Sequence, residues 1–274
     1  MITIDSISKS FGEGTPNEVR ALDSVSLTIT AHEFVIVIGT NGSGKSTLLN
    51  AIAGSVPLHE GRILIDDVDV SRLANHERAR FIGRVFQNPF SGTAPTMTIA
   101  ENLRLAALRG ARKGLSVGLN NRSIRDLQER CSELGMGLEH RMETPIGLLS
   151  GGQRQALTLL MATLREPKIL LLDEHTAALD PKSAEQVLQL TETLVMKHRL
   201  TTLMVTHDMQ EAVRVGTRLV MMDRGAVIVD KSGADKQAIT EEQLVSSFVS
   251  LGQHSVPEIR DQRRHISKDS PEST

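Results

Sequence analysis

The sequence predicts an α/β core that is interrupted by an all-helical insert, and three observations support this fold class. Two apolar runs, Phe34–Ile38 and Ile169–Leu172, have the pattern of strands buried on both faces of a parallel sheet. Stretches with helical spacing of apolar residues alternate with these runs. Between them, residues 95 to 166 show helical spacing alone. We therefore expect a parallel sheet with its helices and, inserted into it, a unit built from helices.

The N-terminal segment is predicted to be mainly strands. The alternation of apolar and polar residues over Val25–Ile29 indicates a strand with one buried face. Residues 48 to 52 carry leucine and isoleucine at helical spacing, and Gly54 suits the end of that helix. Further strands are expected over Arg62–Asp66 and Phe81–Phe86. This half of the core therefore contains a strand, a glycine-rich turn and a helix in succession.

The helical insert has its own start and stop signals. Thr98–Glu101 forms a capping box that begins one helix. A basic, glycine-interrupted loop follows over Arg109–Gly118, and Ser123 is expected to begin a second helix that Gly135 ends. Ser150 is expected to cap a third helix. These signals divide the insert into three helices.

The α/β pattern returns after the insert. Asp180 followed by proline predicts the start of a helix. Thr202–Val205 is a further strand, and Leu219–Val229 has the pattern of a hairpin that turns at an Arg-Gly pair. A last helix is expected from Thr240. Residues 251–274 are polar and charged without periodicity, and we expect them to be a mobile tail.

Composition excludes several classes of protein. The chain has 31 basic and 33 acidic residues, a formal net charge of −2, which argues against a surface that binds nucleic acid throughout. The basic stretch Arg109, Arg112 and Lys113 is better explained as a solvated loop than as a nucleic-acid or lipid-headgroup site, because no aromatic residue interleaves it. A single cysteine, Cys131, excludes a disulfide framework and a four-thiolate zinc site.

The sequence also bears on location. No apolar run approaches the roughly 20 residues that a helix needs to span a bilayer. The N-terminus lacks the basic start and apolar stretch of a signal peptide. We therefore expect an intracellular protein that meets a membrane only through a partner.

A glycine-rich turn between a buried strand and a helix fits the pattern G-x-x-x-x-G-K-[ST]. Its residues are Gly39, Thr40, Asn41, Gly42, Ser43, Gly44, Lys45, Ser46 and Thr47. Glycines allow backbone N–H groups to converge on phosphate oxygens, and the helix N-terminus adds partial positive charge. Lys45 is expected to reach the β- and γ-phosphates, and the Ser46 hydroxyl to ligate Mg²⁺. A plain glycine-rich turn is the alternative, and its flanking strand and helix argue against it.

Two acidic residues end the apolar strand Ile169–Leu172. Asp173 suits a water-mediated contact with Mg²⁺ beside the phosphates. Glu174 is placed to accept a proton from an attacking water. Two acids after a strand are by themselves more often a solvated strand end, but a phosphate loop in the same chain favours the catalytic interpretation.

A second predicted anion site lies at the start of the third insert helix. Ser150 caps this helix, and Gly151, Gly152 and Gln153 form its first turn, so backbone N–H groups are exposed there. One nucleotide does not require two such sites on one chain. The economical explanation is that this site binds the γ-phosphate of a nucleotide held by a second copy of the chain.

These motifs together resemble the nucleotide-binding subunit of an ABC transporter. The residues from Leu149 to Gln153 match the signature motif of that family. Residues 39–47 match its Walker A motif, and residues 169–174 match its Walker B motif. Gln87 matches the Q-loop, Asp180 the D-loop and His207 the switch histidine. The matches occur in the family's order and cover about residues 1 to 250. The resemblance implies a P-loop NTPase (RecA-like) core with an antiparallel β subdomain and an inserted α-helical subdomain, the ABC ATPase fold.

The resemblance also implies a division of the chain and roles for its residues. Residues 1–94 and 167–250 would form the nucleotide-binding core, and residues 95–166 the helical signature-motif subdomain. Gln87 would contact Mg²⁺ or the attacking water, and His207 would hold the γ-phosphate and orient Glu174. Asp180 would cross the interface between two copies while capping its own helix. Phe11 falls where the family places an aromatic residue that stacks on adenine; a core phenylalanine is the alternative.

Two features depart from the family pattern or add to it. Where the family usually has proline after the catalytic glutamate, this chain has His175, which is either near the γ-phosphate or an ordinary loop histidine. Phe90 and Met97 are large apolar residues in a segment stiffened by prolines, directly after the Q-loop. They suit a groove for a helix of a transmembrane subunit; the alternative is that they turn inward and seal the insert.

The function implied by the resemblance is ATP hydrolysis that drives transport of a small solute. Two copies would enclose two ATP with Mg²⁺, at the cytoplasmic face of the cell membrane, peripheral to separate permease subunits. The motif details resemble a bacterial importer subgroup that works with a substrate-binding protein and includes amino acids among its cargoes, with no nucleic acid as partner. A soluble ABC-type ATPase in a non-transport process is the alternative, although such proteins often carry two cassettes, long coiled coils or zinc cysteines. A regulator without turnover is disfavoured by the presence of both Glu174 and His207.

Overall fold

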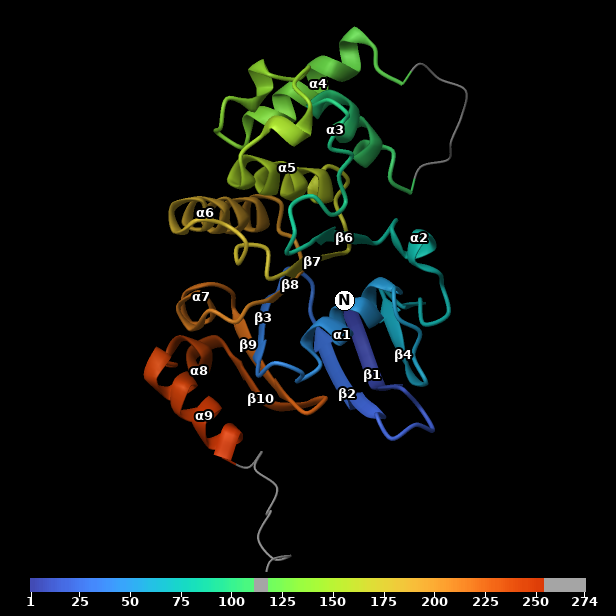
Figure 1. Cartoon of the computed structure of the whole chain (residues 1–274), viewed down its shortest axis with the longest axis vertical. Coiled ribbons are helices and arrows are strands. Elements are labelled where there is room, and N and C mark those ends of the chain that lie inside the picture. The colour runs from blue at the N-terminus through green and yellow to red at the C-terminus, as the bar shows by residue number, and fades with distance from the viewer. Residues whose placement is uncertain (111–117, 254–274) are drawn as a thin grey trace, which may run out of the picture.

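The computed structural model describes residues 1–110 and 118–253, and the strands within these ranges form two sheets (Figure 1). The larger sheet has the strand order β10-β9-β3-β8-β7-β6. Its strands are Phe34–Gly39 (β3), Ile82–Val85 (β6), Ile169–Asp173 (β7), Thr202–Val205 (β8), Arg218–Asp223 (β9) and Ala226–Ser232 (β10). Every pairing between neighbours is parallel except that of β10 with β9. The predicted parallel sheet and its terminal hairpin are therefore both present.

The smaller sheet has the strand order β2-β1-β4-β5 and is antiparallel. Its strands are Ile2–Phe11 (β1), Val19–Ile29 (β2), Glu60–Ile65 (β4) and Val68–Asp69 (β5). The alternation predicted for residues 25 to 29 is confirmed, because Val25, Leu27 and Ile29 are buried while the residues between them are exposed. An antiparallel sheet can leave one face to solvent in this way.

Helices cover the sheets and build the insert. Their bounds are Lys45–Ala53 (α1), Asn75–Arg78 (α2), Ile99–Ala107 (α3), Asn121–Ser132 (α4), Gly151–Thr163 (α5), Pro181–Lys197 (α6), Met209–Arg214 (α7), Gly233–Gln237 (α8) and Glu241–Gln253 (α9). Two single turns of 3₁₀ helix lie at Leu138–His140 (η1) and Ile146–Leu148 (η2). In Figure 1, α3, α4 and α5 lie together at one end of the molecule, away from the smaller sheet. None of the helices in the described ranges is long and apolar enough to cross a membrane.

The parallel sheet separates two apolar clusters. Successive side chains of β3 point to opposite faces, so Val35 and Val37 pack in one cluster and Ile36 and Ile38 in the other. The first cluster joins the large sheet, α1 and the smaller sheet, and the second joins it to α6 and α7. A third cluster lies within the insert and includes Cys131. The continuous apolar character of β3 is thus explained by helices or sheets on both sides.

Several predicted boundaries are wrong by a few residues. Helix α4 begins earlier than Ser123, because the Asn120 side chain caps it and accepts a hydrogen bond from the Ser123 N–H. It ends at Ser132, before Gly135. The last helix runs through Gln253, so the expected tail begins later than residue 251. The rest of that tail, and Arg112 and Lys113 of the basic stretch, lie outside the described residues.

Candidate functional site

The phosphate loop joins β3 to α1 and lines a cavity of about 280 Å³. The loop contributes Asn41, Gly42, Ser43, Gly44, Lys45, Ser46 and Thr47, and the other lining residues are Phe11, Val19, Ala21 and Glu174. The cavity therefore contains most of the predicted phosphate-binding residues. It also holds the predicted catalytic glutamate and the predicted adenine-stacking residue, which are far from the loop in sequence.

Neighbouring backbone atoms leave no room for a side chain at two glycines of this loop. A Cβ at Gly44 would lie 2.4 Å from the backbone oxygen of Ala21, and its φ of +102° is one that L side chains rarely adopt. A Cβ at Gly39 would lie 2.3 Å from the backbone oxygen of Met222. The loop is thus packed between β2 and β9, which fixes its backbone before any ligand arrives.

The loop also carries one buried polar group that lacks a partner in the described part of the chain, and a lysine that bonds to the loop's own backbone. The Ser43 hydroxyl is buried and has no hydrogen-bond partner among the described residues. The Lys45 ammonium donates to the carbonyl oxygens of Gly39 and Thr40, at 2.8 and 2.9 Å. Burial lowers the pKa of Lys45, and the carboxylates of Glu174 and Asp173 act in the opposite direction. An unpaired buried hydroxyl beside a lysine at a helix N-terminus fits an anionic ligand that would supply the missing acceptors.

Phe11 stands at the rim of the cavity. It ends β1 and pairs with Val19 of β2, and its side chain is 44% exposed. The alternative that Phe11 is a core residue is therefore wrong. The Lys9 ammonium lies over the ring, 5.4 Å from its centre.

Glu174 and His207 meet at the ends of two neighbouring parallel strands. Glu174 follows β7 and His207 follows β8, and one oxygen of the Glu174 carboxylate lies 3.2 Å from Nδ1 of His207. Glu174 has a φ of +44°, an uncommon conformation for a residue other than glycine. Its N–H donates to the Val205 carbonyl oxygen and its own carbonyl oxygen accepts from Ala177, which holds this turn in place.

Asp173 is paired with a residue that the sequence did not reveal. One oxygen of its carboxylate lies 3.1 Å from a guanidinium nitrogen of Arg84, and both side chains are less than one-fifth exposed. Arg84 lies on β6, which pairs with β7, so the contact depends on strand order. In the residues that the structure describes, no cluster of three or more His, Cys, Asp or Glu side chains is suited to hold a metal ion. The Asp173 carboxylate and the Ser46 hydroxyl are oxygen ligands of the kind Mg²⁺ takes when phosphates supply the others.

His175 does not line the phosphate cavity. Its side chain is fully buried, and Nε2 lies 2.9 Å from the hydroxyl of Thr191 on α6. Burial lowers its pKa to about 4, so the imidazole is neutral near pH 7. The alternative that placed His175 near the γ-phosphate is therefore wrong, and the ring anchors the loop after Glu174 to α6.

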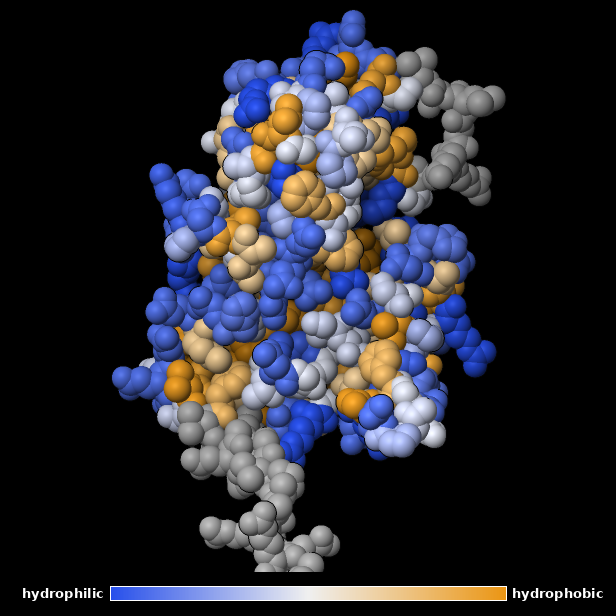
Figure 2. All heavy atoms as spheres, in the orientation of Figure 1, coloured by the Kyte–Doolittle hydropathy of each residue, from blue (hydrophilic) through white to orange (hydrophobic). Residues whose placement is uncertain are grey.

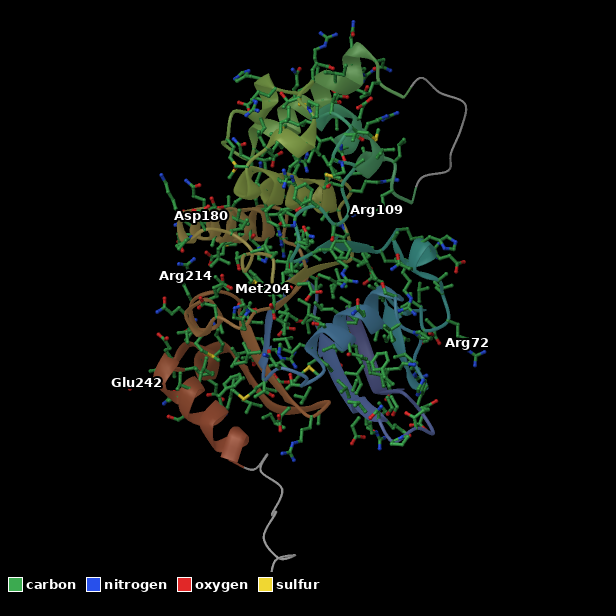
Figure 3. All side chains as sticks on the ribbon, viewed as in Figure 1. Arg72, Arg109, Asp180, Met204, Arg214 and Glu242 are labelled. Atoms are coloured by element: carbon green, nitrogen blue, oxygen red, sulfur yellow. The ribbon has the colours of Figure 1, made fainter. Side chains whose placement is uncertain are left out.

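The remaining predicted site residues lie outside this cavity. Gln87 is exposed after β6. The segment from Ser150 to Gln153 begins α5, where the Ser150 hydroxyl accepts from the Gln153 N–H and the Gln153 side chain accepts from the Ser150 N–H. A Cβ at Gly152 would lie 2.9 Å from the side chain of Ser183, so α5 begins against α6. Asp180 caps α6 and accepts from the Ser183 N–H, and Figure 3 shows it on the opposite side of the molecule from Arg109.

Comparison with known proteins shows to which family the chain belongs. A family model described as ABC transporter matches residues 22–177. The chain belongs to the ABC transporter family. The tyrosine transport ATP-binding protein of Clostridioides difficile is 41% identical over 250 residues, which are 90% of this chain and 98% of that protein. The thiamine import ATP-binding protein ThiQ of Escherichia coli K12 is 36% identical over 204 residues, 74% of this chain and 82% of that one.

Solved structures of ABC cassettes share the fold. A dimeric ATP-binding cassette in a post-hydrolysis state, bound to ADP and Pi, is 31% identical with a TM-score of 0.71, covering 85% of this chain and 98% of that one. A second cassette, in its ADP conformation, has a TM-score of 0.76 at 26% identity and covers 92% of this chain and 98% of the other. The chain is thus an ATP-binding subunit of an ABC transporter with the ABC ATPase fold, and it is an ATPase.

Proposed function

We propose that two copies of this chain enclose two ATP, each bound by the phosphate loop of one copy and by the segment from Ser150 to Gln153 of the other. The cavity at the phosphate loop supports the first half of this arrangement, because it contains the unpaired Ser43 hydroxyl and Phe11. The second half is supported by the position of Ser150, which lies outside that cavity although its helix N-terminus is suited to an anion. In this assembly Asp180 faces the partner copy.

Hydrolysis in this proposal depends on the pair formed by Glu174 and His207. Glu174 accepts a proton from the attacking water, and His207 holds the γ-phosphate and orients the glutamate. Their separation of 3.2 Å is the single observation that carries this assignment. Ser46, Asp173 and Gln87 would hold Mg²⁺, which neutralises charge on the phosphates when bound. The Asp173 carboxylate would then leave its ion pair with Arg84 and contact the hydrated Mg²⁺ instead.

The proposed biological role is import of a small solute, with amino acids as the favoured class. Two relatives support this role by their names, one assigned to tyrosine transport and the other to thiamine import. We further propose that the subunit lies peripherally at the cytoplasmic face of the cell membrane, bound to separate permease subunits. A substrate-binding protein is expected to complete the system.

The docking site proposed for the permease is a groove of about 450 Å³ between the helical end and the larger sheet. Arg84, Ala94, Leu105 and Met161 are among its lining residues, which come from β6, from the loop after it and from α3 and α5. Figure 2 shows hydrophobic residues in the recess on this side of the molecule. Phe90 lies in the same loop after β6 and is 46% exposed, which favours the docking surface over the inward alternative for this residue, whereas Met97 is half-buried.

The division of the chain into subdomains is part of the same proposal. Residues 95–166 would form the signature-motif subdomain, and residues 1–94 with 167–250 the nucleotide-binding core. A separate apolar cluster supports this division, since its buried members run from Ile99 to Leu160. A unit with its own core can rotate as a body when the two copies close.

Glu174→Gln tests the proposed mechanism directly. The amide keeps the size of the carboxylate but cannot take the proton, so turnover of ATP should fall by about 10²–10⁴-fold. ATP binding should persist, and an ATP-bound dimer should accumulate. Steady-state hydrolysis and gel filtration with ATP measure the two effects, with Glu129→Gln at an exposed position of α4 as the control. Near-normal hydrolysis by Glu174→Gln would overturn the assignment.

A further inference from the structure

Glu211 of α7 joins the two loops that carry Glu174 and His207. The hydroxyl of Thr176 donates to Oε1 of Glu211 at 2.8 Å, and the hydroxyl of Thr206 donates to Oε2 at 2.6 Å. Thr176 follows Glu174 by two residues, and Thr206 directly precedes His207. The Glu211 carboxylate therefore links the segments that follow β7 and β8, through two threonines that lie within two residues of Glu174 and His207.

Both hydrogen bonds are sheltered and charge-assisted. Thr176 is 6% exposed and Thr206 is 2% exposed. Hydrogen bonds to an ionised acceptor are shorter and roughly twice as strong as neutral ones. The Thr206 hydroxyl also accepts from the Asp208 N–H at 3.1 Å, so its single proton is directed to Glu211. The arrangement fixes the backbone on both sides of His207.

The position of Glu211 is itself set by the start of α7. Asp208 caps this helix, and its Oδ1 accepts from the N–H groups of Gln210 and Glu211, at 2.8 and 3.0 Å. The sequence Thr206-His207-Asp208 is thus held by a buried hydroxyl on one side and a helix cap on the other. His207 lies at the middle of this turn.

Packing does not hold the ring of His207 in place, although the Glu174 side chain is only 22% exposed. The His207 side chain is 60% exposed, and the contact described for its ring is the one with Glu174. Glu174 has the uncommon φ of +44°, a conformation that persists only where the surrounding structure imposes it. The backbone therefore helps to keep the two side chains 3.2 Å apart. Glu211 adds a side-chain bridge between the two segments, beyond the point where the Glu174 N–H donates to the Val205 carbonyl oxygen.

We propose that Glu211 is a positioning residue for ATP hydrolysis, acting through Thr176 and Thr206 to hold Glu174 and His207 in register. The inference rests on the proposed roles of these two residues. It gives the carboxylate of α7 a function that its position in sequence does not reveal. Glu211 is not among the residues that line the cavity at the phosphate loop, so we expect its removal to change ATP affinity little.

The test compares Glu211→Ala with Thr206→Val and Thr176→Val in the full-length protein. Glu211→Ala should lower kcat by roughly 10–100-fold, the scale for a displacement of about 1 Å at a reacting group. The dissociation constant for a non-hydrolysable ATP analogue should stay within about twofold. Each valine variant should lower kcat by less than Glu211→Ala does. Glu129→Gln, which removes an exposed charge on α4 in the helical insert, should leave kcat unchanged.

A double-mutant cycle separates positioning from general destabilisation. If Glu211 acts through His207, adding Glu211→Ala to His207→Ala should cause no further loss of kcat. Multiplied losses in the double variant, or an unchanged kcat in Glu211→Ala, would overturn the inference. Should circular dichroism show that Glu211→Ala does not fold, Thr206→Val replaces it in the cycle. Multiplied losses in that double variant, or an unchanged kcat in Thr206→Val, would then overturn the inference. Near-normal turnover in both His207→Ala and Glu174→Gln would instead refute the proposed function.

Discussion

At the scale of single residues, burial decides what each side chain can do. His175 directly follows Glu174 in sequence and His207 lies 3.2 Å from it in space, yet the first is fully buried and the second is mostly exposed. The buried ring is neutral and bonded to Thr191, while the exposed ring faces the glutamate. Periodicity could not separate these two histidines, because both are in loops that follow strands.

Cys131 gives a residue-scale prediction about pH. Burial raises the pKa of its thiol to about 12, from 9.0 for an unfolded cysteine. Above pH 9 the unfolded chain therefore loses a proton that the folded chain keeps, so this thiol makes the protein less stable as pH rises from about 9 to 12. Between pH 8 and 10.5 wild type should lose about 2 kcal/mol more unfolding free energy than Cys131→Ala.

Denaturant unfolding at the two pH values measures this difference. In the native protein at pH 8, the thiol should also resist alkylation, because the thiolate is the reactive form and the side chain is fully buried. Alkylation in denaturant supplies the control for reagent activity. Rapid modification of the native protein would show that the cluster around Cys131 is open.

At the scale of elements, a buried amide organises the loop that leads into α3. The Asn102 side chain is 1% exposed, accepts from the Ala94 N–H and donates to the carbonyl oxygens of Ala94, Met97 and Thr98. The Thr98 hydroxyl caps the same helix, at 3.2 Å from the Glu101 nitrogen. The cap was predicted from sequence, but the role of Asn102 was not.

Two substitutions in this element should differ in cost. Thr98→Ala removes one cap and should lower the free energy of unfolding by about 1 kcal/mol. Asn102→Ala removes the acceptor of the Ala94 N–H and the donor to three carbonyl oxygens, and should cost about 2–3 kcal/mol. Urea unfolding of both variants, with Thr98→Ser as the control that keeps a cap, measures the order. If both substitutions lower the free energy of unfolding by the same amount, water must supply the hydrogen bonds that the Asn102 amide makes.

Elements with strong local signals were predicted and the short ones were not. The sequence indicated β3, α1, β7 and the hairpin, because continuous apolar runs, glycine turns and capping residues are local features. Helices α7 and α8 have only 6 and 5 residues, too few for a clear period, and they are stable through tertiary contacts. In the site, the loop residues follow from their motif, whereas the pairing of Arg84 with Asp173 requires knowing that β6 lies beside β7.

At the scale of the whole molecule, the groove beneath the helical end and the proposed partner-facing surface at Asp180 lie on opposite sides (Figure 3). A permease helix in the groove would thus leave the surface at Asp180 free for the second copy. Arg84 lines the groove and also pairs with Asp173. The two proposed sites are therefore joined by one side chain.

Cross-linking in native membranes tests the groove. Single cysteines at Phe90 and Leu105, placed after Cys131→Ala, should link to an integral membrane protein, because both side chains are about half exposed at or beside the groove. A cysteine at Met196 on α6, which is 72% exposed, is the control and should give no such link. Failure of both groove positions, while a cysteine at Asp180 links to a second copy, would remove the docking assignment.

The exposed ring of Phe11 has an optical consequence. The chain has no tryptophan and no tyrosine, so it scarcely absorbs or emits light in the near ultraviolet. A tryptophan introduced at Phe11 would be the sole indole in the molecule, at the rim of the cavity where adenine is expected to stack. Its fluorescence would report nucleotide arrival and departure without tryptophan background, in the isolated subunit and in any complex whose partners lack tryptophan.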